Sequence, residues 1–353
     1  MKIPKEDEIF MRRCLQLALM AEGQTFPNPM VGSVIVHKGK IIGEGYHSKA
    51  GQPHAEVNAI NKVKDHELLK ASTLYVNLEP CAHHGKTPPC SKLIIDKKIP
   101  RVIIGCQDTY SEVAGKGIQM MRDAGIEVSV GVLEKESRYL NRRFFTYHEK
   151  KRPYIILKWA QTIDGFIDIE RDETYHGQPT WITNEYARQA VHKLRATEQA
   201  IMIGTNTALK DNPSLNVRDW NGSHPLRIVI DKELKLPQAL NLFDQSNPTL
   251  VVTHQEKKSI NNLNYLTISK DLDLMSQVLI YLYKQGIQSL IIEGGATLLN
   301  SVIQNNIWDE AHVYNGDCTF FKGVRAPVIK GHLDETVHFG ESKLYIYRNI
   351  SLI

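Results

Sequence analysis

The chain has 353 residues, 42% of them hydrophobic and 23% charged, with a formal net charge of +4 and five scattered cysteines. The composition is that of a globular protein. An odd number of scattered cysteines argues against a disulfide framework. The absence of any apolar run of roughly 18–20 residues excludes a membrane span. The N-terminus is acidic before a short apolar run and lacks a cleavage site, so we expect a cytoplasmic protein.

The first half of the chain predicts helices that alternate with strands. "KGKIIGEGYH" is typical of the return strand of a hairpin with Gly39 in the turn, and "STLYVNLEPC" of a strand that ends at Pro80. The predicted helices are 6–22, 54–65, 91–99 and 116–126, and the other strands are 31–36, 101–108 and 127–133. This alternation indicates an α/β layer sandwich for residues 1–145.

Near residue 146 the sequence becomes polar and charged, and "TYHEKKRPY" contains Pro153. We interpret the basic cluster at 148–153 as a solvated linker and predict two domains, residues 1–147 and 152–353. A second α/β series follows, with predicted elements at 154–161, 184–196, 199–204, 226–231, 249–254, 273–285, 289–295 and 297–305.

One histidine and two cysteines in the first domain suit a metal ion. His54 begins a predicted helix, Cys81 follows a strand, and Cys90 stands just ahead of another helix. Three protein ligands with an open fourth position are how catalytic zinc is held, whereas structural zinc usually has four. Thiolates near helix N-termini lose their protons more readily. The sequence therefore predicts a catalytic Zn²⁺ site.

Glu56, two residues after His54, has the position of a catalytic proton carrier. A carboxylate beside the open position can take a proton from water and hand it to a leaving amine. Zinc deaminases carry this signature, His-x-Glu and then Pro-Cys-x-x-Cys, with the glutamate not a ligand. Here eight residues lie between Cys81 and Cys90, which departs from the common spacing.

Taken singly, these residues have ordinary alternatives, such as buried thiols and a helix cap. Together with Pro80 and Glu56 they favour a metal site. His83 and His84 rival His54 as ligands, but we favour them as loop residues that face substrate because Glu56 accompanies His54. A non-catalytic zinc module would need a fourth protein ligand. A nucleic-acid deaminase would need a basic, aromatic surface, which a thinly spread +4 does not provide.

The motifs "PNPMVGSVIV", "GEGYH", "AGQPHAEVNAI", "LEPCAHHGKTPPC" and "RVIIGCQD" resemble, in this order, those of bifunctional riboflavin-biosynthesis deaminase/reductases. The long cysteine spacing is that family's own. The resemblance continues in "LKWAQTIDGFI", "WITNEYARQAVHKLRA", "DNPSLNVR" and "IEGGATLLNS", so it covers nearly the whole chain.

The resemblance implies an α/β protein with a cytidine-deaminase-like three-layer α/β/α domain and a dihydrofolate-reductase-like α/β domain. The first would deaminate 2,5-diamino-6-ribosylamino-4(3H)-pyrimidinone 5′-phosphate with zinc. The second would use NADPH to reduce the ribosyl group to ribityl, giving 5-amino-6-(5-phosphoribitylamino)uracil. The partners would be these small phosphates and further copies of the chain in a dimer or tetramer, with no nucleic acid and no membrane.

The resemblance also implies roles for individual residues. Glu56 would be catalytic, and the deaminase substrate would be held by Asn28, His47, His83 and Lys86. In the reductase, the substrate residues would be Lys158, Asp164, Arg195, Leu215, Arg218 and Glu293. The cofactor residues would be Ala160, Trp181, Thr207, Asp211, Gly295, Ala296, Thr297, Leu298, Leu299, Asn300 and Ser301.

The residues alone say less about the second domain. "SLIIEGGATLLNSVI" predicts a strand, a two-glycine turn and a helix, which suits a phosphate but is also an ordinary turn. Arg195 and Arg218 suit a phosphate because a guanidinium binds it in a bidentate fork. Two segments depart from the family pattern: 167–180 is longer than usual and has Pro179 where serine is frequent, and 312–323 lacks a common segment.

Overall fold

The computed structural model describes residues 5–82, 88–109, 114–171 and 180–350. The chain forms two compact units, Met1–Lys151 and Arg152–Ile353. No helix within the described ranges is both long enough and apolar enough to cross a bilayer.

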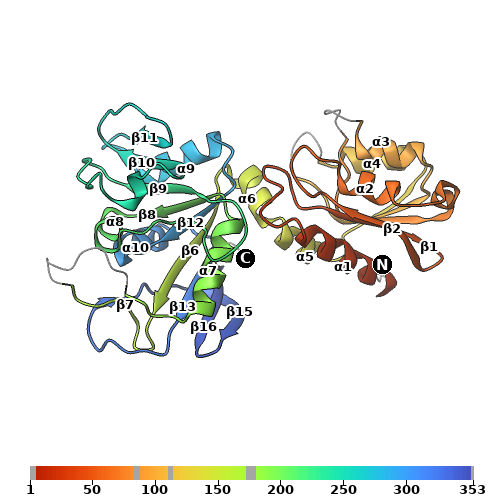
Figure 1. Ribbon diagram of the computed structural model, residues 1–353. Helices are drawn as coiled ribbons and strands as arrows, with labels where there is room; N and C mark the ends of the chain where they lie inside the picture. The colour runs from red at the N-terminus through yellow and green to blue at the C-terminus, as the bar shows by residue number, and fades with distance from the viewer. Residues whose placement is uncertain (1–4, 83–87, 110–113, 172–179, 351–353) are drawn as a thin grey trace. The chain divides into compact units, whose positions relative to one another are not determined.

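The first unit is a five-stranded sheet with helices on both faces (Figure 1). The strand order is β2-β1-β3-β4-β5; β1 pairs antiparallel with β2 and β3, and β3, β4 and β5 run parallel. The strands are β1 (Gly32–His37), β2 (Lys40–Tyr46), β3 (Thr73–Leu78), β4 (Arg101–Cys106) and β5 (Glu127–Val130). The helices are α1 (Lys5–Leu19), α2 (Ala55–Asn61), α3 (Cys90–Asp96), α4 (Lys116–Asp123), α5 (Glu134–Leu140) and α6 (Arg142–Lys150), with a 3₁₀ helix at His66–Ala71.

The layers of this unit follow from the alternation of side chains along each strand. On β1, Val34 and Val36 pack with Phe10 and Met11 of α1 on one face. Ile35 points the other way and joins the core beneath α2, α3 and α4. Both faces of the three central strands β1, β3 and β4 are buried, so these strands are apolar runs rather than alternating patterns.

The linker predicted at 148–153 is wrong for its first half, because α6 continues to Lys150. Lys151, with a φ of +54°, is the residue that caps the helix. Arg138 of α5 holds this helix by an ion pair with Glu149 (2.6 Å) and by stacking on the ring of Phe145 (4.4 Å). Only a few apolar positions mark this short helix, so its charged end resembled a linker.

The second unit is a nine-stranded sheet of order β11-β10-β9-β8-β12-β6-β13-β16-β15. The strands from β11 to β13 are parallel. Strand β16 pairs antiparallel with both β13 and β15. Its strands are β6 (Tyr154–Gln161), β8 (Ala200–Ile203), β9 (Leu226–Ile230), β10 (Thr249–Thr253), β11 (Leu263–Thr267), β12 (Ser289–Glu293), β13 (Glu310–Asn315), β15 (Gly331–Phe339) and β16 (Ser342–Asn349). Strands β7 (Phe166–Asp168) and β14 (Val324–Arg325) pair separately. The helices are α7 (Glu185–Thr197), α8 (Thr205–Asp211), α9 (Leu274–Lys284) and α10 (Ala296–Gln304), with a 3₁₀ helix at Asn241–Phe243.

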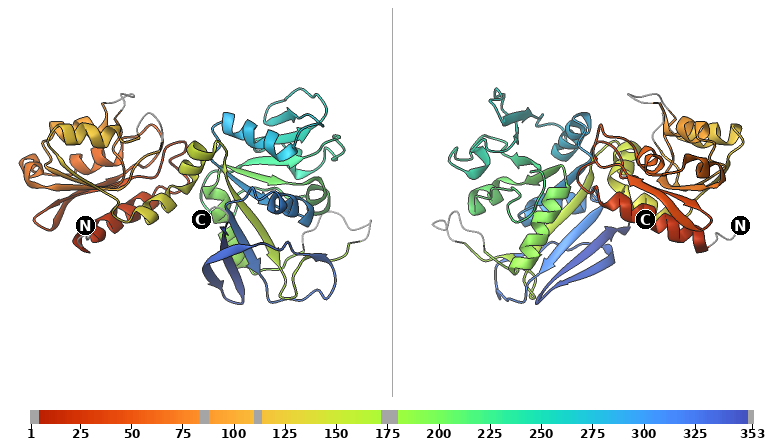
Figure 2. Two further views of the ribbon diagram at one scale, coloured as in Figure 1. Left: turned by 180° about the vertical axis from the view of Figure 1, so that it is seen from behind. Right: turned by 45° about the vertical axis from the view of Figure 1, so that its right-hand side comes forward.

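Helices cover both faces of this sheet, and Figure 2 shows α7 lying along one of them. Leu194 of α7 and Ala208 of α8 pack on the face that carries Ile156, while Met275 of α9 and Leu299 of α10 pack on the other face. In such a sheet ligands bind beside the carboxyl ends of the parallel strands. The predicted cofactor turn follows one of these strands, β12.

Candidate active sites

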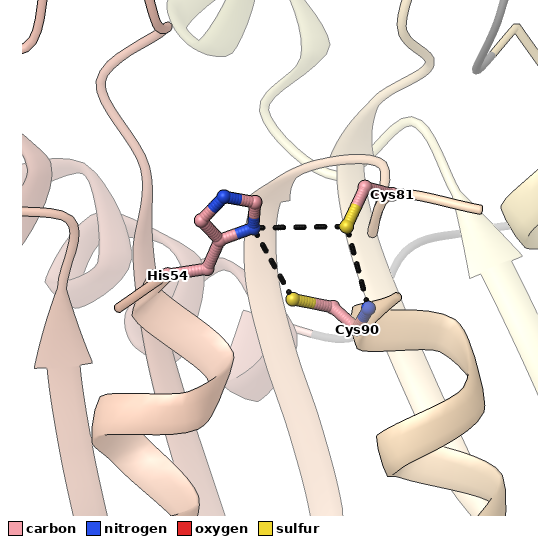
Figure 3. A group of neighbouring side chains, drawn as sticks. All are labelled: His54, Cys81 and Cys90. Carbon is pink, nitrogen blue, oxygen red and sulfur yellow. Dashed lines mark hydrogen bonds between the residues drawn. The ribbon is translucent and has the colours of Figure 1, made fainter. Parts of the chain in front are cut away.

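The predicted metal ligands meet in the first unit. His54 caps the start of α2, Cys81 follows β3, and Cys90 is the first residue of α3. Figure 3 shows Nδ1 of His54 facing both sulfurs, at 3.6 Å from Cys81 Sγ and 3.4 Å from Cys90 Sγ. Three ligand atoms on the ends of three elements therefore surround one point.

This donor set fits a zinc ion. Bonds of about 2.0–2.3 Å in a tetrahedron place neighbouring nitrogen and sulfur ligands roughly 3.5 Å apart, which is the spacing seen. Hydrogen bonding to Cys90 lowers the pKa of the Cys81 thiol to about 4, so one ligand is readily a thiolate. Within the described ranges, which omit residues 83–87, no fourth His, Cys, Asp or Glu joins the three. Among the described residues the site therefore has three protein ligands.

Glu56 lies in the first turn of α2 and is only 3% exposed. Burial, with a smaller contribution from Cys81, raises the pKa of Glu56 to about 6. Interaction with the Cys90 side chain works against this rise. A carboxyl with a pKa near neutrality can both accept and release a proton, which is what a general acid–base residue needs.

Asn28 and His47 lie beside the metal ligands. Nδ2 of Asn28 is 3.0 Å from Nε2 of His47, whose ring lies edge-on to His54 with the centroids 5.4 Å apart. Burial lowers the pKa of His47, which favours the neutral form of its imidazole. His83 and Lys86, the other two predicted substrate residues, lie outside the described residues.

Glu79 has a role that sequence reasoning missed. Its buried carboxylate accepts hydrogen bonds from the backbone N–H groups of Asp108, Gly115, Gly117 and Ile118, at 3.0–3.2 Å. It thus joins the end of β3, just ahead of Cys81, to the end of β4 and the start of α4. A glutamate directly before Pro80, at the end of a buried strand, was the signal in the sequence. The sequence does not indicate its four partners, because they lie 29 to 39 positions away.

In the second unit, one cavity of about 1090 Å³ receives most of the predicted reductase residues. The predicted residues that line it are Lys158, Ala160, Trp181, Arg195, Thr207, Asp211, Leu215, Arg218, Glu293, Gly295, Ala296, Thr297, Leu298 and Ser301. Three others do not line it. Leu299 is fully buried in the core, and Asp164 and Asn300 lie outside the lining.

A charged cluster lies at one part of this cavity. Glu293, at the end of β12, is 3.0 Å from Arg195 of α7 and 3.6 Å from Lys158 of β6. Burial opposes ionisation, yet Arg195 and Lys158 lower the pKa of Glu293 to about 2. Burial lowers the pKa of Lys158, against the attraction of Glu293. The Arg195 guanidinium is thus paired with a carboxylate as well as facing the cavity.

The glycine turn after β12 is held by Thr207. Gly294 has a φ of +112°, and a Cβ there would come within 2.7 Å of Thr207 Oγ1. The same hydroxyl accepts a hydrogen bond from the N–H of Gly295 (2.9 Å). Glycine is therefore required, and the turn leaves the start of α10 open to the cavity, where a phosphate would be stabilised. The turn and the size of the cavity fit a dinucleotide.

The two unusual segments contact predicted residues. Asp164 accepts hydrogen bonds from the N–H groups of Phe320 and Phe321, so the altered segment 312–323 is bound to this carboxylate. Asp211 pairs with Arg171 at 3.0 Å. Arg171 lies in the long segment 167–180 and lines the cavity, and no motif had marked it. Residues 172–179 of that segment lie outside the described residues.

Comparison with known proteins identifies both units. Residues 4–106 match the cytidine and deoxycytidylate deaminase zinc-binding region, and residues 153–331 match the RibD C-terminal domain. The riboflavin biosynthesis protein RibD of Aquifex aeolicus is 42% identical over 87% of this chain and 86% of its own length, and that of Escherichia coli is 38% identical over 88% and 87%.

Solved structures agree over the full length. A diaminohydroxyphosphoribosylaminopyrimidine deaminase/5-amino-6-(5-phosphoribosylamino)uracil reductase from Thermotoga maritima matches with a TM-score of 0.87 and 33% identity, covering 98% of this chain and 99% of the other. RibD of Acinetobacter baumannii matches with a TM-score of 0.86, 31% identity and the same coverage. The molecule is a zinc-type deaminase domain joined to a reductase domain, which confirms the predicted fold class. The chain belongs to the RibD family of bifunctional riboflavin-biosynthesis proteins.

Proposed function

We propose that this chain catalyses two consecutive steps of riboflavin biosynthesis. The first is hydrolytic deamination of 2,5-diamino-6-ribosylamino-4(3H)-pyrimidinone 5′-phosphate. The second is NADPH-dependent reduction of the ribosyl group, which gives 5-amino-6-(5-phosphoribitylamino)uracil. Family membership supports the pair of reactions. The observation that carries the first is the three-ligand cluster of His54, Cys81 and Cys90 with buried Glu56 beside it.

In the deamination, His54, Cys81 and Cys90 would hold a zinc ion, whose Lewis acidity would make a water molecule easier to deprotonate. Glu56 accepts the proton of that water and delivers it to the departing amine, which leaves as ammonia. Its raised pKa suits both transfers. Asn28 and His47, joined by their 3.0 Å contact, would orient the pyrimidine beside Glu56.

In the reduction, the nicotinamide supplies the hydride. The chain's part is to hold the sugar phosphate and the cofactor in one orientation and to exclude water. Lys158 and Arg195 provide cations for the substrate, and the carboxylate of Glu293 keeps both in place. The glycine turn at Gly294 and Gly295 would receive the cofactor's phosphates.

Two assays on the purified full-length chain test this proposal. With the diamino substrate alone, we expect release of one equivalent of ammonia and no further change. Adding NADPH should then produce the ribityl compound, seen as loss of the absorbance of reduced nicotinamide. Ammonia without NADPH consumption would refute the reductase step, and absence of ammonia release would refute the first. The cytoplasmic location stays a prediction from the sequence, and the dimer or tetramer stays an expectation from the family resemblance.

A further inference from the structure

Two buried asparagines of the deaminase unit lie where local structure favours other uses of their side chains. Asn77 is fully buried among the apolar residues of β3, although asparagine is depleted in strands. Asn141, 3% exposed, stands at the N-cap of α6, where an asparagine ordinarily accepts a hydrogen bond from its own helix. The Asn141 side chain makes no such bond. Both side chains therefore act on other parts of the unit.

Both asparagines bind the backbone around Met30, in the segment that leads into β1. Oδ1 of Asn141 accepts from the N–H of Met30 (2.8 Å), and its Nδ2 donates to the carbonyl oxygen of Met30 (2.9 Å). Nδ2 of Asn77 donates to the same carbonyl oxygen (3.1 Å), and its Oδ1 accepts from the N–H of Gly32 (2.7 Å). These four hydrogen bonds, here called the Met30 clamp, use the donor and the acceptor of each amide.

The Met30 clamp limits the freedom of Asn28, a predicted substrate residue. Only Pro29 separates Asn28 from Met30, and the proline ring fixes its own φ. On its other side, the N–H of Asn28 donates to the carbonyl oxygen of buried Thr25 (2.8 Å). Asn28 is thus held between a turn and the clamp, which sets the direction of its side chain.

The segment held by the clamp also reaches the metal ligands. The carbonyl oxygen of Val31 accepts from the N–H of His47 (2.9 Å), whose Nε2 meets Asn28 at 3.0 Å. Nδ1 of His47 lies 3.2 Å from the carbonyl oxygen of Pro53, the residue before His54. Any shift of the segment would therefore move Asn28 relative to the metal site.

We propose that Asn77 and Asn141 are positioning residues for the deamination, which hold Met30 so that Asn28 faces the pyrimidine. The inference rests on the proposed deamination and adds two residues that act through Asn28. It also makes the start of α6, 111 positions from Met30, a part of the deaminase site.

Steady-state kinetics of the full-length protein with the diamino substrate test this role. Asn141→Ala should lower kcat/KM of deamination by about 10²-fold, the size of a roughly 1 Å misplacement. The loss should lie mainly in KM, because Glu56 and the metal ligands are outside the clamp, and Asn77→Ala should raise KM in the same way. Zinc content and the reduction of added deaminated intermediate should not change. The matched control is Asn61→Ala at the exposed end of α2, which should deaminate like the unmodified chain.

Combining Asn141→Ala with Asn28→Ala separates positioning from a general loss of structure. If the clamp acts through Asn28, adding Asn141→Ala to the Asn28→Ala chain should cost no more than a few fold. A full hundredfold loss in that chain, or an unchanged KM in Asn141→Ala, would overturn the proposal.

Asn141→Ser, which keeps one hydroxyl for Met30, is the milder variant if alanine prevents folding. Loss of zinc from both Asn141 variants would also overturn the proposal, because the asparagine would then support the whole unit rather than its substrate segment. If the unmodified chain released no ammonia, the proposed deamination itself would fail. Normal deamination by both Asn141 variants, with an active unmodified chain, would refute only the clamp.

Discussion

The two active sites of this chain are assembled in different ways. In the deaminase unit, His54 and Glu56 share the start of α2, Cys81 follows β3 and Cys90 begins α3. In the reductase unit, the charged cluster takes one residue each from β6, α7 and β12. Both sites depend on the sheet that positions their elements, but the metal ligands are at most 36 positions apart in sequence. In the second site Arg195 and Glu293 are 98 positions apart, and the parallel sheet brings them to one edge.

The difference predicts how each site fails. A change in the metal cluster should remove chemistry and leave the second unit's reaction intact. A change in the charged cluster should affect both reduction and stability, because its members neutralise one another in a buried place. Substitutions in the two units can therefore test whether the two sites are separate in practice.

The largest effect should come from removing a metal ligand. In Cys81→Ala, we expect bound zinc to fall from near one per chain to near zero. Deamination should fall by more than the roughly 10²–10⁴-fold that a general acid–base residue supplies. Reduction of added deaminated intermediate should stay unchanged. Metal analysis and the two assays measure this, with Cys106→Ala, a buried thiol outside the cluster, as control. Loss of reduction would show that the units depend on each other.

A smaller effect should follow from Glu56→Gln, which keeps shape and removes the titrating group. Deamination should fall by about 10²–10⁴-fold because no other group in the turn can carry the proton. Zinc content and reduction should not change, which separates the proton carrier from the ligands. Glu67→Gln, an exposed glutamate in the same unit, serves as control. Full deamination by Glu56→Gln would refute the mechanism.

The same contrast explains what the sequence could predict. His54, Glu56 and the cysteines are unusual residue types at informative spacing, so the metal site was predictable from them. The partners of Glu79 were not, because they are backbone N–H groups whose positions depend on how β4 and α4 pack. Tyr314 lies 5.7 Å from the Lys158 ammonium through the pairing of β13 with β6, which no motif reports.

The elements were predicted where they are long and buried. Strands β6, β9, β10 and β12 are apolar runs with clear ends, and they lie where expected. Helices α5, α6 and α8 were not predicted, because their few apolar positions stand among charged and polar residues and show no clear period. The helix predicted at 54–65 ends at Asn61, because Asp65 caps a separate 3₁₀ helix by accepting from the N–H of Glu67.

In the reductase unit, Glu293→Gln should reduce stability as well as reduction. It leaves the buried charges of Lys158 and Arg195 without a carboxylate, at a cost of about 3–5 kcal/mol. For a unit of this size each kcal/mol lowers the melting temperature by about 2–4 °C, so calorimetry should show a clear shift. Glu233→Gln, which removes an exposed glutamate, should shift it little.

The stability difference between Glu293→Gln and the unmodified chain should depend on pH. Glu293 has a pKa of about 2 in the folded chain, below its ordinary value of about 4.3 in an unfolded one. Its contribution is therefore fully present above about pH 4.3 and is lost as the pH falls towards 2. Unfolding by denaturant at several pH values measures this, and a difference that grows on acidification would contradict the ion-pair assignment.

The smallest effect should come from the start of α7, the helix that carries Arg195 near its other end. The Asn184 side chain accepts a hydrogen bond from the N–H of Ala187 (3.0 Å) and donates one to the carbonyl of Phe339. Losing the cap in Asn184→Ala should cost about 1 kcal/mol, a shift of about 2–4 °C in melting temperature. Asn184→Ser should recover much of the lost stability, because serine can cap the helix although it cannot reach Phe339.

Deamination should be unaffected, and reduction should change by no more than a few fold because Glu293 still holds Arg195. A hundredfold loss of reduction in Asn184→Ala would instead mean that the whole helix, and not the ion pair, positions the guanidinium, so the dispersed site would depend on still more of the chain than its charged cluster indicates.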